Sequence, residues 1–179
     1  VDRHIDSLSQ GFREKAELLA RDIDLITAMK QGDSEALQKK LRSLMVETES
    51  EFLTLTDANG MVLGRAHANS LGDSAKKQET VSKALSGTVT SGIIKGKEIT
   101  FSLRAAAPIK ENGRIIGTIS LGTSLSDKDF VDDVKKFSDL EVTVFNGDTR
   151  EMTTIIKNGR RAVGTKMTNP EVTATVIDR

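Results

Sequence analysis

The chain has 179 residues, no formal net charge at pH 7, and 37% hydrophobic against 29% charged residues, which excludes a disordered chain and argues against a nucleic-acid binder. Its aromatic residues are six Phe, so stacking platforms for bases or sugars are not expected. Cysteine is absent, which excludes thiolate catalysis, disulfides and cysteine-based zinc sites.

The sequence contains no apolar run that approaches the roughly 20 residues needed to span a bilayer. It starts at Val1 rather than Met, inside a helical pattern. We therefore expect a soluble fragment whose flanking segments, including those that attach it to a membrane, lie outside the chain.

The first part of the chain has apolar residues at helical spacing. Steps of three, four and seven residues predict one long amphipathic helix with a coiled-coil-like seam, formed by Ile5, Leu8, Phe12, Leu19, Ile23 and Ile26. Gly32 then interrupts the pattern, and Asp33 or Ser34 can cap a second helix that carries Leu37, Leu41, Leu44 and Met45.

From residue 52 the hydrophobic period changes to that of strands. FLTLTD and MVLGRAH flank Asn59-Gly60, which predicts a β-hairpin. A short helix ending at Gly87 follows, and then three strands joined by turns at residues 95–97 and at Asn112-Gly113. We expect an α+β fold, with a five-stranded antiparallel sheet and its helices on one side.

A second, partial α/β module is expected after residue 126. Residues 127–137 have a helical apolar face, LEVTVFNGD and MTTIIKNGRRAVG repeat the hairpin pattern, and Pro170 can open a helix. The expected domains are a helical region at 1–49, a ligand-binding module at 50–126, and an incomplete module at 127–179.

Signs of catalysis are missing from the sequence. His4 and His67 are the only histidines, no serine lies in a nucleophile elbow, no glycine-rich loop has phosphate-binding spacing, and no ligand spacing suggests a metal. We therefore expect no catalytic residue, no metal and no cofactor. If the protein were an enzyme, His67 would be its only candidate general base.

Several polar residues lie at every second position of the expected strands. Residues two apart along a strand point to the same side, so these residues are expected on one face of the sheet. The set expected to bind a ligand comprises Arg65, His67, Thr100, Ser102, Arg104, Thr118 and Ser120. On the other face, Val62, Phe101, Leu103, Ile119 and Leu121 are expected to pack against helices. Two guanidinium groups with a neighbouring His and hydroxyls suit a small organic anion. The alternative is that these are ordinary exposed strand and loop residues.

The runs LTDANGMVLGRAH, SLG, KALSG and FSLRAAAPIKENGRIIGTISLG resemble the Cache family of PAS-like extracytoplasmic sensor domains, found in methyl-accepting chemotaxis receptors and sensor histidine kinases. The resemblance covers about residues 50–125 and points to the branch that senses citrate and C4-dicarboxylates. It implies that His67, Arg104 and Ser120 occupy ligand-binding positions. Gly64 stands where the citrate sensors have a second Arg, with Arg65 next to it, and Ala106 replaces a Lys.

Fewer cations imply a ligand less charged than a tricarboxylate, so we expect a mono- or dicarboxylate such as acetate, propionate or a C4 acid. The resemblance further implies a periplasmic or extracellular domain of an inner-membrane chemotaxis receptor that forms a homodimer through its N-terminal helix. Residues 141–167 resemble the start of a module seen in such receptors. Two alternatives remain: the sensor domain of a histidine kinase, and an interaction module without a small ligand.

Overall fold

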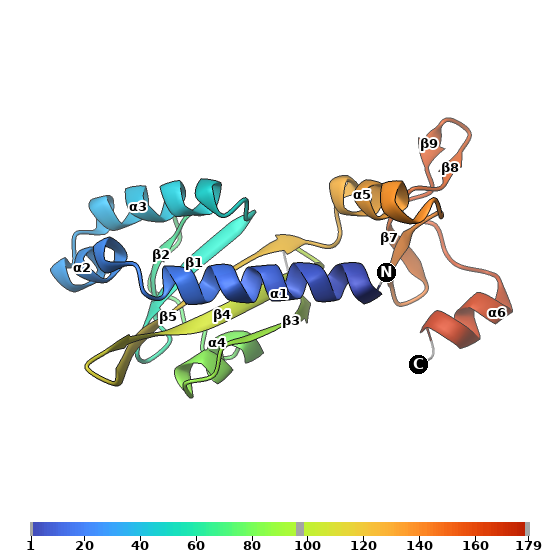
Figure 1. Cartoon of the computed structure of the whole chain (residues 1–179). Helices are drawn as coiled ribbons and strands as arrows, with labels where there is room; N and C mark the ends of the chain where they lie inside the picture. The colour runs from blue at the N-terminus through green and yellow to red at the C-terminus, as the bar shows by residue number, and fades with distance from the viewer. Residues whose placement is uncertain (1, 96–98, 178–179) are drawn as a thin grey trace. The chain divides into compact units, whose positions relative to one another are not determined.

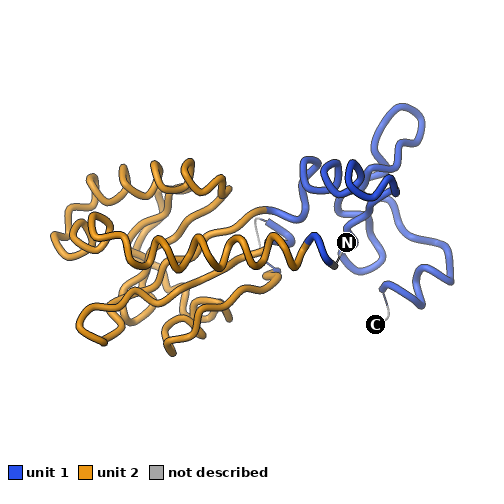
Figure 2. Tube along the Cα trace, in the orientation of Figure 1, with its two compact units in different colours: residues 1–4, 95–102, 124–179 blue, residues 5–94, 103–123 orange. Residues whose placement is uncertain are grey.

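The computed structural model describes residues 2–95 and 99–177. The chain divides into two compact units (Figure 2), of which the sheet unit comprises residues 5–94 and 103–123, and the C-terminal unit comprises residues 1–4, 95–102 and 124–179. The turn expected at residues 95–97 falls mostly on residues that lie outside the described ones. The expected division at residues 49 and 126 stays a prediction.

Three helices precede the first strand: α1 (Asp2–Leu19), α2 (Ile23–Gln31) and α3 (Ser34–Glu47). The prediction of a single helix through Ile26 is wrong, because Asp22 accepts a hydrogen bond from the backbone N–H of Leu25 at 2.8 Å and starts a new helix. The predicted cap of the next helix is confirmed, since the Asp33 carboxylate accepts from two backbone N–H groups of α3.

The five-stranded sheet is confirmed, with strand order β2-β1-β5-β4-β3. Its strands are β1 (Phe52–Asp57), β2 (Val62–Arg65), β3 (Thr90–Lys95), β4 (Phe101–Glu111) and β5 (Arg114–Ser124). The β1–β2 turn is stabilised by Asp57, whose carboxylate accepts from the N–H groups of Asn59 and Met61. The β4–β5 turn has positive φ at Asn112 and Gly113, as a tight hairpin requires.

The two faces of this sheet pack against different helices (Figure 1). On one face a Cβ added at Gly64 would lie 2.4 Å from Cδ1 of Leu41 in α3, so glycine allows the helix to approach closely. The other face is covered by α4 (Glu79–Leu85), whose buried Val81 packs with Val62 and Ala75. The expectation that all helices lie on one side is therefore wrong.

A β-bulge places Val62 on the α4 side. Leu55 pairs with Gly64, but the next residue, Thr56, pairs with Val62, so Leu63 is the extra residue. Neighbouring residues of β1 point to opposite faces, and their partners Gly64 and Val62 therefore do so as well. The expectation that Val62 packs with the strand residues Leu103, Ile119 and Leu121 is wrong for this reason.

The C-terminal unit consists of short elements around a small core. They are α5 (Lys128–Ser138), β6 (Thr143–Asn146), β7 (Thr149–Thr153), β8 (Ile156–Lys157), β9 (Arg160–Arg161), α6 (Pro170–Val172) and a π-helical turn η1 (Thr173–Ile177). Val131, Val134 and Val142 form its buried apolar cluster. The helix at 127–137, the hairpins and the helix opening at Pro170 are confirmed.

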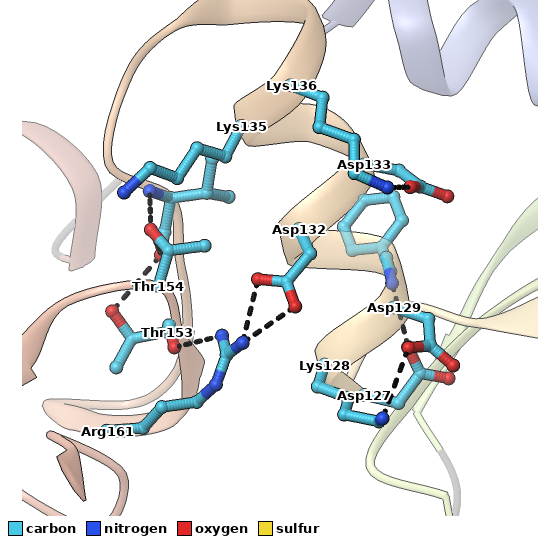
Figure 3. A network of polar contacts seen from close by, with 12 residues as sticks. Asp127, Lys128, Asp129, Asp132, Asp133, Lys135, Lys136, Thr153, Thr154 and Arg161 are labelled. Carbon is cyan, nitrogen blue, oxygen red and sulfur yellow. Dashed lines mark hydrogen bonds and ion pairs between the residues drawn. The ribbon is translucent and has the colours of Figure 1, made fainter.

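Ion pairs connect these short elements (Figure 3). Both carboxylate oxygens of Asp132 on α5 accept from Nη2 of Arg161 on β9, at 2.8 and 2.7 Å. The other terminal nitrogen of Arg161 donates to the carbonyl of Thr153 at the end of β7. One guanidinium therefore joins a helix, a strand end and a hairpin within the C-terminal unit.

Among the described residues, every helix is either too short or too polar to cross a membrane.

Candidate functional site

The sheet face under α4 carries buried hydroxyl groups. The register of β1 with β5 pairs Thr54 with Ser120 and Thr56 with Thr118. The hydroxyl oxygens of Thr56 and Thr118 lie 2.8 Å apart. All four side chains are at most 6% exposed. Because Thr54 also pairs with Arg65 on β2, strand register brings Arg65, Thr118 and Ser120 onto one face, which we call the hydroxyl face.

Arg104 reaches the hydroxyl face from β4. Its guanidinium carbon lies 4.6 Å from the centre of the Phe52 ring, and its Nη1 donates to Oε1 of Gln78, just before α4, at 3.3 Å. Burial lowers the pKa of Arg104, and the nearby positive charge of Arg65 lowers it further. Two cations are thus close enough to repel each other at this face.

Gly122 makes room for the stack of Arg104 on Phe52. It pairs with Phe52 across β1 and β5, and an added Cβ would lie 1.9 Å from the carbonyl oxygen of Leu103 and 2.8 Å from Cε2 of Phe52. Any side chain at this position would therefore displace the strand or the ring.

Arg65 is held by an acidic residue of the following segment. Its two terminal nitrogens donate to the two carboxylate oxygens of Asp73, each at 2.7 Å. One of them also donates to the carbonyl of Ser70 at 2.7 Å. These bonds from Arg65 lower the pKa of the Asp73 carboxyl, so Asp73 is charged at neutral pH and compensates the charge of Arg65.

His67 lies just past the end of β2 and is exposed. Its Nδ1 accepts a hydrogen bond from the backbone N–H of Leu53 at 3.3 Å, and its ring meets the Phe52 ring edge to face, with centroids 6.0 Å apart. Since Nδ1 is an acceptor, the neutral ring carries its proton on Nε2. His67 and Arg104 both contact Phe52, so these three side chains lie together.

Two further residues of the expected set lie on or beside β4. Ser102 is fully buried, two residues before Arg104. Thr100 precedes the strand and belongs to the C-terminal unit, where its hydroxyl donates to Oε1 of Glu151 at 2.7 Å. Its hydrogen-bond partner Glu151 is therefore not a residue of the hydroxyl face, and we leave Thr100 out of the site proposed below.

Four residues near this face were not expected from the sequence: Phe52, Asp73, Gln78 and Thr80. The Thr80 hydroxyl on α4 is buried and has no hydrogen-bond partner among the described residues. A buried hydroxyl without a partner is costly, and a bound ligand is one way to supply the partner. Periodicity shows that a helix begins near residue 79, but it does not show where these side chains point.

Other features do not indicate a reaction centre. Within residues 2–95 and 99–177, no group of three or more His, Asp and Glu is placed to hold a metal ion. A hollow of about 640 Å³ lies between α3 and the segment at 69–71, where Gln38, Lys39, Arg42 and Asn69 form part of its lining. It contains neither Arg65 nor Arg104.

The fold is similar to that of several solved sensor domains. The sensor domain of the Vibrio cholerae histidine kinase DctB matches with a TM-score of 0.64 and 14% identity, over 82% of this chain and 59% of that one. The Escherichia coli DcuS sensor domain matches with a TM-score of 0.60 and 23% identity, over 68% and 92%. This chain thus spans less than two thirds of the DctB domain.

A chemoreceptor also shares the fold. The ligand-binding domain of Campylobacter jejuni Tlp3, solved with 4-methylisoleucine, matches with a TM-score of 0.53 and 15% identity, over 75% of this chain and 56% of that one. No match was found among curated protein sequences. The model of one family, described as the double sensory domain of two-component sensor kinases, matches residues 1–177. The chain therefore belongs to this dCache_3 family of sensory domains.

Proposed function

We propose that this sensory domain is the extracytoplasmic part of a membrane receptor and binds a small organic carboxylate at its hydroxyl face. The observation that carries the proposal is the placement of Arg104, half-buried over Phe52 and beside Gln78. A partly desolvated guanidinium binds a carboxylate more strongly than an exposed one, because less water competes for it.

Neighbouring groups support the same ligand. His67 meets the Phe52 ring on which Arg104 stacks, Ser120 lies on the same face, and the buried Thr80 hydroxyl on α4 has no partner among the described residues. These groups are candidates to bind the oxygens of a carboxylate together with Arg104. The segment 66–78 and α4 cover this face. A ligand bound there would therefore shift the equilibrium between conformations in which these elements take different positions.

The experiment is calorimetric titration of a panel of small carboxylates into the wild type and Arg104→Ala. We expect the substitution to weaken binding about tenfold to a hundredfold, as for loss of a charge-assisted hydrogen-bonded pair. Arg114→Ala is the matched control, because Arg114 is exposed at the opposite end of β5 from Gly122. Equal binding by both variants would rule out the site.

For the receptor's output we propose a histidine kinase, with chemotaxis signalling, which the sequence resemblance led us to expect, as the second candidate. The family description, which names two-component sensor kinases, favours the kinase, whereas the fold is shared by both classes. Sequencing the gene beyond residue 179 distinguishes them, since a kinase catalytic domain or a methylated helical bundle would follow.

The homodimer also remains a proposal. Phe12 and Leu19 of the expected α1 seam are buried within the sheet unit, so they are not available to a second copy. Ile5 and Leu8 are only half-buried, and we propose that pairing uses this first part of α1. Sedimentation of the chain with Leu8→Glu tests it, because a charge there should favour the monomer.

A further inference from the structure

Arg150 on β7 is a buried arginine of the C-terminal unit, at 9% exposed. Its Nη1 donates to the hydroxyl of Thr165 at 3.0 Å and to the carbonyl of Lys166 at 2.8 Å, and its Nη2 contacts the thioether sulfur of Met167 at 3.7 Å. These three partners are uncharged, whereas a guanidinium stays protonated in proteins. A buried cation is stabilised by an opposite charge, so an anion at Arg150 would be favourable.

The two terminal nitrogens lie on different edges of the Arg150 guanidinium, and only one edge is bonded to oxygen. Nη1 is used by Thr165 and Lys166. The buried Nε has no hydrogen-bond partner among the described residues, and Nη2 meets a sulfur, which is a weak acceptor. Nε and Nη2 donate from the same edge of the planar group, and two parallel bonds from such an edge fit the two oxygens of a carboxylate.

The Met167 side chain is what lies against Nη2 at this edge. It is only half-buried, and its neighbours Lys166 and Thr168 are exposed. The backbone N–H of Met167 donates to the carbonyl of Asp148 at 2.7 Å, so the main chain is fixed while the unbranched side chain can rotate about three bonds. Rotation would open the edge to solvent without breaking the backbone pairing, and the space released is that of one side chain.

We propose that the C-terminal unit binds a small carboxylate, of the size of acetate or propionate, at the Nε–Nη2 edge of Arg150 in place of the Met167 thioether. The ligand supplies charge-assisted hydrogen bonds to both nitrogens. The backbone N–H of Arg150 donates to the Thr165 carbonyl at 2.9 Å, and its carbonyl accepts from Gly164 at 2.8 Å. A ligand held by the same residue therefore stabilises the pairing of residues 164–167 with β7.

The experiment is a titration of the whole chain with sodium acetate, followed by NMR at the arginine Nε–H groups and the Met167 methyl group. We expect the signals of Arg150 and Met167 to shift and to saturate with a dissociation constant of about 1 mM, as suits so small a ligand. Acetamide, which has the shape of acetate but no charge, and sodium chloride at equal ionic strength should leave both signals unchanged. Arg161 is the internal control, because its Nη2 already bonds to both oxygens of Asp132.

Three variants test the assignment of the site. Arg150→Lys keeps the charge but removes the planar edge, so acetate should bind at least about tenfold more weakly, as read from the Met167 methyl group. Met167→Ala removes the side chain that the ligand displaces, so binding should become about threefold tighter or more, as read from the Arg150 Nε–H. Arg104→Ala alters the hydroxyl face and should leave the shifts of Arg150 and Met167 as in the wild type.

The outcomes decide this proposal separately from the function proposed above, because the two sites share no residue. Absence of an acetate-dependent shift at Arg150 and Met167 overturns it, as do shifts that acetamide or chloride reproduces or that Arg104→Ala abolishes. If the spectrum of Arg150→Lys shows that the C-terminal unit is unfolded, Met167→Ala decides: tighter binding supports the site, and equal or weaker binding overturns it. A hydroxyl face that binds no carboxylate leaves the site at Arg150 standing.

Discussion

The sheet unit and the C-terminal unit are stabilised in different ways. In the sheet unit, long aliphatic side chains fill the space between the sheet and α1–α3, and several of them, including Leu41, Leu53, Ile119 and Leu121, are at most 1% exposed. In the C-terminal unit the buried apolar cluster consists of three valines. There, guanidinium groups and threonine hydroxyls make many of the contacts between elements.

Arginine shows the same contrast. On the hydroxyl face Arg104 is half-buried and stacks on Phe52. In the C-terminal unit Arg150 is only 9% exposed, and its Nη1 donates to the hydroxyl of Thr165 and the carbonyl of Lys166. In the sheet unit the arginine thus lies on a face above a large aliphatic core, whereas in the C-terminal unit it holds neighbouring segments together by polar contacts.

The largest expected effect is the loss of an aliphatic side chain from the sheet unit. Leu121→Ala should lower the free energy of unfolding by about 2–5 kcal/mol, because the side chain is 1% exposed and leaves a cavity. Leu140→Ala in the C-terminal unit is the control, since Leu140 is 66% exposed and should cost about 0.5 kcal/mol or less. Urea unfolding measures both. A loss for Leu121→Ala no larger than that for Leu140→Ala would show that the aliphatic core does not carry the stability of the sheet unit.

A smaller, local effect is expected from Arg150→Ala. The substitution leaves the Lys166 carbonyl and the Thr165 hydroxyl without the bonds that Nη1 supplies, at a cost of about 1–3 kcal/mol. Hydrogen exchange should accelerate at the N–H groups of Gly164 and Met167, which bond to this hairpin. Amides of β1 and β5 should not change. Acceleration there as well would mean that the units do not open separately.

The fold was largely predictable from the sequence, because its signals are local. Asn59-Gly60 and Asn112-Gly113 mark hairpins, because these residue types readily adopt the backbone conformation of a tight turn. Asp33 marks a helix start, because its carboxylate accepts hydrogen bonds from the first N–H groups of the helix. The break between α1 and α2 was missed because Asp22 sits within a continuous apolar stripe. The bulge at Leu63 was missed because it depends on how two strands pair, and it placed Val62 on the other face.

The candidate site was predictable only in part. Strand parity brings Arg65, Thr118 and Ser120 to one face, and this follows from a period of two residues. The salt bridge of Arg65 with Asp73 depends on the path of an irregular segment, for which no periodicity exists. For the same reason the sequence could not show that Asp73 pairs with Arg65, and the assignment of ligand-binding residues stays a prediction.

The smallest expected effect is the loss of stability of the C-terminal unit at low pH. The pKa values of Asp132, Glu141 and Asp148 are lowered by bonds from Arg161, Lys135 and Lys166 respectively. A lowered pKa in the folded state contributes stability above the ordinary pKa values of 3.8 and 4.5, and that stability is lost as the pH falls through the lowered values. The sheet unit has such groups too, Asp22 and Asp73 among them, but its aliphatic core is unaffected by protonation.

Hydrogen exchange measured between pH 6 and pH 3, corrected for the intrinsic exchange rate at each pH, should therefore show the C-terminal unit opening first. Asp132→Asn tests the cause, because it removes the charge that pairs with Arg161 while keeping the side chain's size. At pH 6 this variant should already show the exchange that the wild type reaches in acid near β9, and its further dependence on pH there should be weaker. A variant with the same acid response as the wild type would show that other groups control opening.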